Sequence, residues 1–136
     1  PQTAGQLGGF KVQARDLDSA RKLLLDAKSL VDAGAFAIVL ECVPGPLAGI
    51  VTRQIEVPTI GIGAGPECDG QVLVINDLLG LTERKPPSFV KKYADLAPQV
   101  RQAVIAFRDE VRAGAYPAAE HTFGAKVDFS SLLGEI

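Results

Sequence analysis

A single acidic residue ends the most apolar run of the chain and is the first candidate for chemistry. Residues 35–40 read AFAIVL, and Glu41 follows them directly. Reactive side chains gather at the carboxyl ends of parallel strands, and an ionisable group there seldom serves packing. Desolvation at such a position disfavours the carboxylate and moves a glutamate towards general-base duty near neutral pH. Position alone leaves a second interpretation open, in which Glu41 belongs to a loop and simply faces water.

The segment GIGAGP at residues 61–66 is the second candidate. Glycines after a strand let backbone N–H groups approach a ligand, and in α/β proteins that ligand is often a phosphate. The spacing G-x-G-x-G does not match the dinucleotide-binding fingerprint, and no clear helix follows. A tight turn that needs small residues is therefore the favoured interpretation. In CDGQ (residues 68–71), Asp69 is interpreted as a turn former rather than a catalyst.

His121 is the only histidine, so this chain alone cannot form a Ser-His-Asp triad or a multi-histidine metal site. A capping or interface role for His121 is favoured over catalysis. Cys42 and Cys68 lack CxxC spacing, which predicts neither a zinc site nor a disulfide framework and favours a reducing compartment. Charges of both signs are interspersed between Glu83 and Arg112, as on a solvated surface.

The elements that must position these residues follow an α/β pattern. Apolar residues spaced by three and four predict a helix over residues 18–33, and the run 35–40 predicts a parallel strand covered on both faces. Pro46 can open a short helix that extends to Ile55. Two further strands are predicted at residues 59–63 and 72–75, separated by a loop.

The rest of the chain is predicted to be helical and then irregular. A polar connection at 76–87 leads to helices at 89–94 and 98–113, with a break before Pro98. Val100, Val104, Phe107 and Val111 repeat at helical spacing and are expected to pack on the body of the domain.

Composition limits the class of protein. The 136 residues suit one domain, and 14 basic against 16 acidic side chains give a formal charge of −2, which argues against a nucleic-acid-binding surface. No apolar run approaches the roughly 20 residues of a membrane span, and no basic-then-apolar leader is seen. Three parallel strands leave two unpaired edges, so other strands must complete the sheet. The opening PQTAGQLGG lacks an initiator methionine and suggests a fragment.

Six motifs in order carry a resemblance to a known family. They are VLECVP (39–44), PTIGIGAGP (58–66), CDGQVLV (68–74), FVKKYADL (89–96), VRAGAYP (111–117) and EHTF (120–123), preceded by GGFKVQAR (8–15). Together they closely resemble ketopantoate hydroxymethyltransferase over residues 1–123. The resemblance implies a barrel domain over 1–123, whereas residues 124–136 lack a counterpart and are predicted to form an extended or partly disordered tail.

The resemblance implies the C-terminal part of a (βα)8 TIM-type barrel, incomplete on its own, in which the three strands are the sixth to eighth. The family transfers a hydroxymethyl group from 5,10-methylenetetrahydrofolate to 3-methyl-2-oxobutanoate, giving 2-dehydropantoate (ketopantoate) in pantothenate biosynthesis. Glu41 matches the glutamate of the family's LECVP motif, the general base that removes the C3 proton. Strand parity predicts that Ile62, Val72 and Val74 face inward and form the apolar wall around the isopropyl group.

The implied cofactor is Mg²⁺, but no residue of this chain matches the family's metal-binding carboxylates or its substrate-binding serine and lysine. Those groups are expected in an N-terminal segment of the same enzyme, which would be a necessary partner. A homo-oligomer, a decamer by resemblance, and a cytoplasmic location are also expected. Two alternatives remain open: a non-catalytic assembly fragment of the barrel, and a related lyase that uses the same glutamate on another 2-oxo acid.

Overall fold

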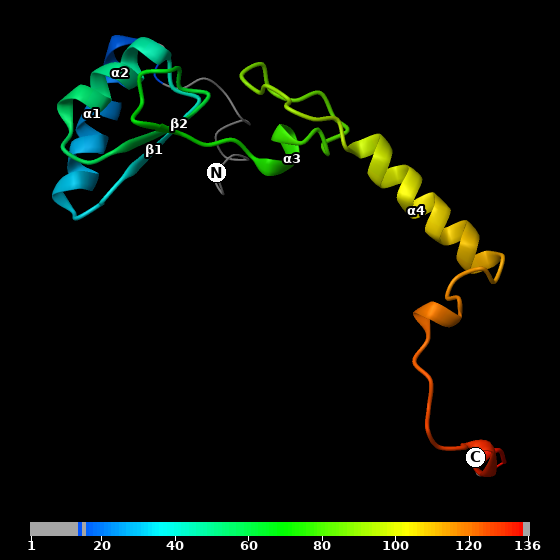
Figure 1. Cartoon of the computed structure of the whole chain (residues 1–136). Helices are drawn as coiled ribbons and strands as arrows, with labels where there is room; N and C mark the ends of the chain where they lie inside the picture. The colour runs from blue at the N-terminus through cyan, green and yellow to red at the C-terminus, as the bar shows by residue number, and fades with distance from the viewer. Residues whose placement is uncertain (1–13, 15, 135–136) are drawn as a thin grey trace. The chain divides into compact units, whose positions relative to one another are not determined.

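The computed structural model describes residue 14 and residues 16–134, which fall into two compact units divided between Ala94 and Asp95 (Figure 1). The segment GGFKVQAR, apart from Ala14, and the opening PQTAGQLGG lie outside the described residues. The first unit contains α1 (Leu17–Asp32), β1 (Ile38–Glu41), α2 (Gly45–Gln54), β2 (Thr59–Ile62), β3 (Gly70–Gln71) and α3 (Ile75–Leu78). The second contains α4 (Ala97–Arg112), η1 (Ala119–His121) and η2 (Ser130–Leu132). The α/β prediction is confirmed.

The three strands form a parallel sheet in the order β1-β2-β3. Residues Ile38–Glu41 pair with Thr59–Ile62, which places Glu41 beside Ile62 at the carboxyl ends of the two strands. α2 supplies the crossover between β1 and β2 that a parallel pair requires.

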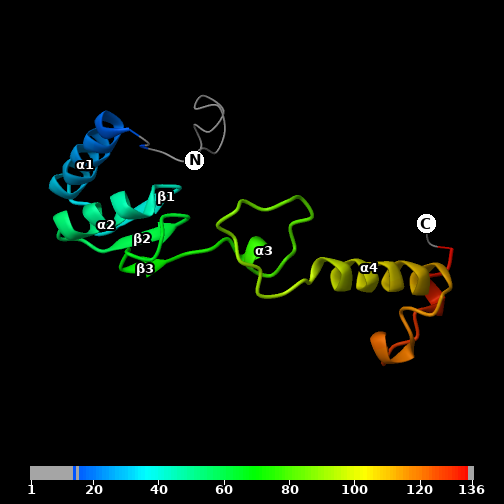
Figure 2. The same ribbon diagram turned by 90° about the horizontal axis from the view of Figure 1, so that it is seen from above.

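One face of the sheet is covered by α1 and α2, which lie against each other (Figure 2). The hydrophobic core on this face comprises Ala27, Ile38, Leu40, Val43, Leu47, Ala48, Val51 and Ala64. Asp16 begins α1 with a reciprocal capping box, in which its carboxylate accepts from the Ser19 N–H at 2.8 Å. The predicted helix at 18–33 is therefore confirmed within one residue.

The opposite face of β1 is left open by the described residues. Val39 is 59% exposed and Glu41 is also exposed, whereas Ile38 and Leu40 are buried. The prediction that both faces of this strand are covered is wrong for this part of the chain, because α1 and α2 pack on one side only. Side chains alternate along a strand, so Val39 and Glu41 share the open face with their pairing partners Ile60 and Ile62.

The third strand differs from its prediction. It spans Gly70–Gln71 rather than residues 72–75, and Val72 adds one more bond by donating its N–H to the Gly61 carbonyl at 3.0 Å. β2 ends at Ile62, and Gly63 turns the backbone with φ of +65°. Residues 73–74 therefore have no β2 residue to pair with. Ile75, the last residue of the predicted strand, begins the short helix α3, which extends into the predicted polar connection.

The helix predicted at 89–94 is not formed. The Val90 N–H donates to the Pro87 carbonyl in a turn, and the Tyr93 N–H donates to the Leu78 carbonyl at 2.9 Å. The Tyr93 bond ties this segment back to α3, so a long-range contact replaces the local bonds of a helix.

The helix predicted at 98–113 is confirmed as α4. Its apolar stripe, Val100, Val104, Phe107 and Val111, is between 45% and 60% exposed within the second unit. The packing of this stripe on the domain body stays a prediction. None of the helices within residues 16–134 has the length and apolar character that crossing a bilayer requires.

Candidate active site

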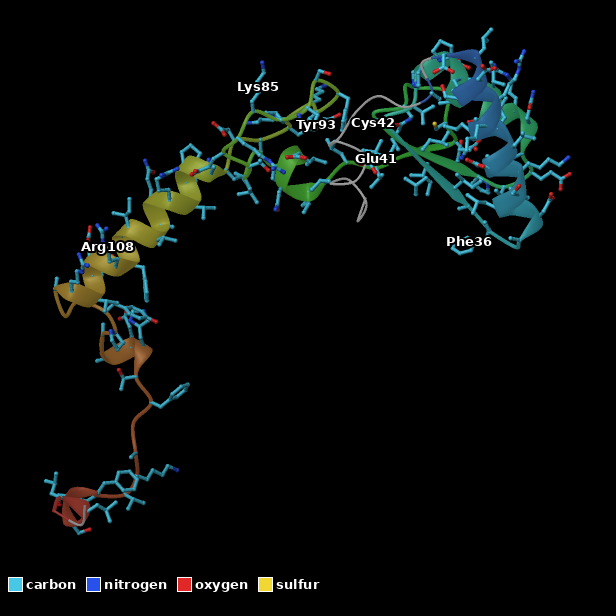
Figure 3. The ribbon with its side chains drawn as sticks, turned by 180° about the vertical axis from the view of Figure 1, so that it is seen from behind. Phe36, Glu41, Cys42, Lys85, Tyr93 and Arg108 are labelled. Carbon is cyan, nitrogen blue, oxygen red and sulfur yellow. The ribbon has the colours of Figure 1, made fainter. Side chains whose placement is uncertain are left out.

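Glu41 stands at the carboxyl end of β1, and Phe36 lies near the other end of that strand (Figure 3). The Glu41 side chain is exposed, so the described residues do not supply the burial expected around it. Adjacent strands lie roughly 4.8 Å apart, and the paired Ile62 is therefore its immediate neighbour on the open face. Glu41 is placed to reach a small molecule laid across the ends of β1 and β2.

The residue after Glu41 holds a backbone conformation that favours glycine. Cys42 has φ of +54°, and its N–H donates to the Ile62 carbonyl at 2.9 Å. This bond extends the pairing of β1 and β2 past Glu41 and holds the backbone that carries the carboxylate. Burial, and secondarily the charge of Glu41, raises the pKa of the Cys42 thiol, which keeps it neutral at pH 7.

The GIGAGP segment is a tight turn packed on the start of α2, as its favoured interpretation predicts. Gly63 and Gly65 have positive φ, and Ala64 between them is fully buried. A Cβ placed on Gly65 would lie 2.9 Å from the Gly45 Cα. The loops that follow β1 and β2 therefore meet backbone to backbone, at the same edge of the sheet as Glu41.

The same loop is fastened to α2 a second time through Glu67. The Glu67 carboxylate occupies the space that a side chain at Gly49 would need, and it accepts from Arg53 Nη1 at 2.7 Å. Such exposed ion pairs contribute only about 0 to 1 kcal/mol to stability.

Asp69 ties the end of this loop to the start of β2. Its Oδ2 accepts from the Thr59 backbone N–H at 2.8 Å and from Thr59 Oγ1 at 3.1 Å. Thr59 is fully buried, and its hydroxyl also lies 2.8 Å from Thr52 Oγ1. Thr59 is at the amino end of β2, away from Glu41, so Asp69 has the structural role that the turn interpretation predicts.

The hydrogen bonds to Asp69 predict a pH-dependent stability. The Thr59 N–H, followed by the Thr59 hydroxyl, lowers the pKa of Asp69 from its usual 3.8. The folded state then binds this proton less readily than the unfolded state, so the stabilisation is present above pH 4 or so and is lost as pH falls through the folded-state pKa. We expect Asp69→Asn to lower the urea midpoint at pH 7, and the difference in midpoint from wild type should become smaller below about pH 4. An equal difference at pH 7 and pH 3 would contradict this role.

A groove of about 490 Å³ lies at the carboxyl end of β2, lined by Gly63, Gly65, Pro66, Gln71 and Phe89. Gln71 Nε2 donates to the Gly65 carbonyl at 2.9 Å. The Phe89 ring covers Gly63 so closely that a Cβ there would lie 2.7 Å from ring atom Cδ1. Phe89 was not predicted as a site residue, because no local pattern signals a contact between segments so far apart in the chain.

The three residues predicted to form the apolar wall lie in different elements and differ in exposure. Ile62 is half-buried beside Glu41 on the open face. Val72 is 48% exposed just beyond β3, and Val74 is 51% exposed at the start of α3. Strand parity does not extend to Val74, so the structure brings only Ile62 next to Glu41, and the substrate contacts of all three stay predictions.

The described residues do not fit a metal site by themselves. They contain no group of three or more His, Cys, Asp or Glu side chains that could hold an ion. His121 has instead the favoured capping role, since its Nδ1 accepts from the Ala118 N–H at 3.2 Å. The site is therefore one carboxylate on an open apolar sheet face, with a groove at the same edge.

Comparisons with known proteins indicate the family to which the chain is similar. A sequence model described as ketopantoate hydroxymethyltransferase matches residues 1–119. A protein of Desulfotalea psychrophila is 62% identical over 133 residues (98% of this chain, 48% of the relative), and one of Syntrophomonas wolfei is 56% identical over the same length with the same coverage. A protein of Moorella thermoacetica is 58% identical over 123 residues (90% of this chain, 46% of the relative). All three are named 3-methyl-2-oxobutanoate hydroxymethyltransferase, and the chain spans about half their length.

Proposed function

The chain belongs to the ketopantoate hydroxymethyltransferase family, and on this premise we propose that it is part of an enzyme that transfers a hydroxymethyl group from 5,10-methylenetetrahydrofolate to 3-methyl-2-oxobutanoate. The product is 2-dehydropantoate, in pantothenate biosynthesis. The acceptor, 3-methyl-2-oxobutanoate, appears in the names of the relatives. The observation that carries the proposal is the position of Glu41, at the carboxyl end of β1 and beside Ile62.

We propose that Glu41 is the general base. Its carboxylate takes the proton from C3 of the oxo acid, and the C–H electron pair forms an enolate with the neighbouring carbonyl. The enolate carbon then forms a bond to the methylene carbon of the donor. Overall, water supplies the hydroxyl oxygen and tetrahydrofolate is released. Ile62, and by the sequence prediction Val72 and Val74, would contact the isopropyl group.

The open sheet face supports the proposal that the site is completed by other parts of a larger protein. Val39, Ile60 and Ile62 present apolar groups on the face that carries Glu41, and apolar surface of this kind is stabilised by burial. We propose that the remaining strands of a (βα)8 barrel cover it, and that β1, β2 and β3 are the sixth to eighth strands in the C-terminal part of the enzyme. The remaining strands would also supply the desolvation that a base requires.

Mg²⁺ is proposed as cofactor, with its ligands outside the described residues, because these contain no suitable cluster. When bound, the ion would stabilise negative charge on the substrate oxygens. The proposed role of Glu41, removal of a proton from carbon, does not depend on the identity of those ligands. Assembly into a homo-oligomer and a cytoplasmic location are part of the same proposal.

The full-length enzyme offers a direct test of this function. With Mg²⁺ and 3-methyl-2-oxobutanoate in deuterated water, but without the donor, NMR should show loss of the C3 proton signal. Adding 5,10-methylenetetrahydrofolate should then give 2-dehydropantoate. Absence of both reactions would favour a non-catalytic assembly role, and cleavage of another 2-oxo acid without folate would favour a lyase.

A further inference from the structure

The groove at the carboxyl end of β2 has a lining suited to a flat, uncharged ring. Its volume, about 490 Å³, is within the usual range for small-molecule sites. None of the five described residues that line the groove carries a charge, and Gly63, Gly65 and Pro66 present backbone and ring atoms rather than long side chains. The Gln71 amide is the one polar side chain among them.

Phe89 provides an aromatic surface in this groove. The ring atoms nearest to Gly63 are Cγ, Cδ1 and Cε1, all on one side of the ring, and 38% of the residue remains exposed. Two backbone hydrogen bonds hold the segment that carries Phe89. The Val90 N–H donates to the Pro87 carbonyl, and the Tyr93 N–H donates to the Leu78 carbonyl. An exposed ring on a fixed backbone can stack on a planar ligand at low cost in conformational entropy.

The groove is also close to Glu41. Gly63 follows Ile62, which is the pairing partner of Glu41. With strands about 4.8 Å apart and consecutive Cα atoms about 3.8 Å apart, the Cα atoms of Gly63 and Glu41 are within roughly 10 Å of each other. One ligand can therefore occupy the groove while a second molecule contacts Glu41.

We propose that this groove binds the pterin of the one-carbon donor, with Phe89 stacked on its planar pyrimidinone ring and Gln71 facing the polar edge of that ring. The inference rests on the proposed function and deepens it. Among the described residues of the lining, Phe89 offers a surface for a ring, whereas no cationic side chain is present to pair with the carboxylate of the acceptor. The neutral fused ring of 5,10-methylenetetrahydrofolate needs no such partner.

The test compares two readouts in the full-length enzyme. The first is the KM for 5,10-methylenetetrahydrofolate at saturating 3-methyl-2-oxobutanoate, and the second is C3 proton exchange measured without the donor. Phe89→Ala should raise the donor KM about tenfold, since stacking on an aromatic ring is lost, with the exchange rate within about threefold of wild type. Phe89→Tyr retains the ring and should keep the donor KM within about threefold of wild type.

Phe36→Ala is the matched control, because it removes an 89% exposed ring near the opposite end of β1. This variant should leave both readouts unchanged. The proposal would be overturned if Phe89→Ala left the donor KM unchanged. It would also be overturned if Phe89→Ala lowered the rate of C3 proton exchange by as large a factor as it raised the donor KM, because Phe89 would then maintain the structure of the whole site rather than bind the donor. If wild type itself neither exchanges the proton nor uses the donor, the proposed function fails instead.

Discussion

Replacing Glu41 with glutamine is expected to reduce C3 proton exchange of 3-methyl-2-oxobutanoate by a factor of about 10² to 10⁴ in the full-length enzyme. Glutamine preserves the size and much of the polarity of the side chain, but it cannot accept the proton. Glu41 is exposed on the open face, so the substitution disrupts no buried contact in the described residues. The loss should appear in exchange and in product formation while the variant stays folded, as judged by its circular dichroism.

Glu56→Gln is the control for this variant. Glu56 is also an exposed glutamate, but it lies between α2 and β2, before the amino end of the strand that pairs with β1. Its replacement should leave exchange within about twofold of wild type, as for surface charges remote from a site. Exchange in Glu41→Gln that matched the Glu56→Gln value would exclude Glu41 as the base.

Gly65→Ala is expected to destabilise the full-length protein by about 2 to 4 kcal/mol. Two costs add at this position. Gly65 has φ of +78°, which an L residue with a Cβ seldom adopts, and the new Cβ would lie 2.9 Å from the Gly45 Cα. Because the second contact is with backbone, it cannot be relieved by a side-chain rotation. Urea unfolding followed by circular dichroism should show a lower midpoint with an unchanged slope.

Gly34→Ala separates these two costs. Gly34 ends the turn after α1 with φ of +96°, but nothing lies within 4 Å of the position that its Cβ would take. The variant should therefore lose only the conformational contribution, about 1 to 2 kcal/mol. If both glycine variants were equally destabilised, the close contact of Gly65 with Gly45 would make no measurable contribution to the cost of the Gly65 substitution. The close backbone packing of Gly65 on Gly45 would then be wrong.

Local patterns in the sequence were sufficient for much of the framework. Helical spacing of apolar residues predicted α1 and α4, and the apolar run before Glu41 predicted β1 with the carboxylate at its carboxyl end. These signals are reliable because helix periodicity and strand composition depend on neighbours within a few residues. The turn roles of Asp69 and of the GIGAGP glycines could be inferred for the same reason.

Predictions from local patterns were wrong where contacts with residues far away in the chain decide the conformation of the backbone. The run 72–75 has the composition of a strand, but β2 ends before it can pair with residues 73–74. Residues 89–94 were predicted to be helical, but the bond from Tyr93 to Leu78 holds them in another conformation. Coverage of both faces of β1 was expected from composition, although the described residues supply helices for one face only.

The sequence by itself determined the residue type at the end of β1, the helices α1 and α4 that precede and follow the strands along the chain, and the family to which the chain belongs. Only the tertiary structure decided that Glu41 stands next to Ile62, that the loops after β1 and β2 meet at Gly45 and Gly65, and that Phe89 covers Gly63. The physical reason is that strand register and contacts between loops are set by packing and hydrogen bonds among residues far apart in the chain, whose geometry no short window of sequence contains.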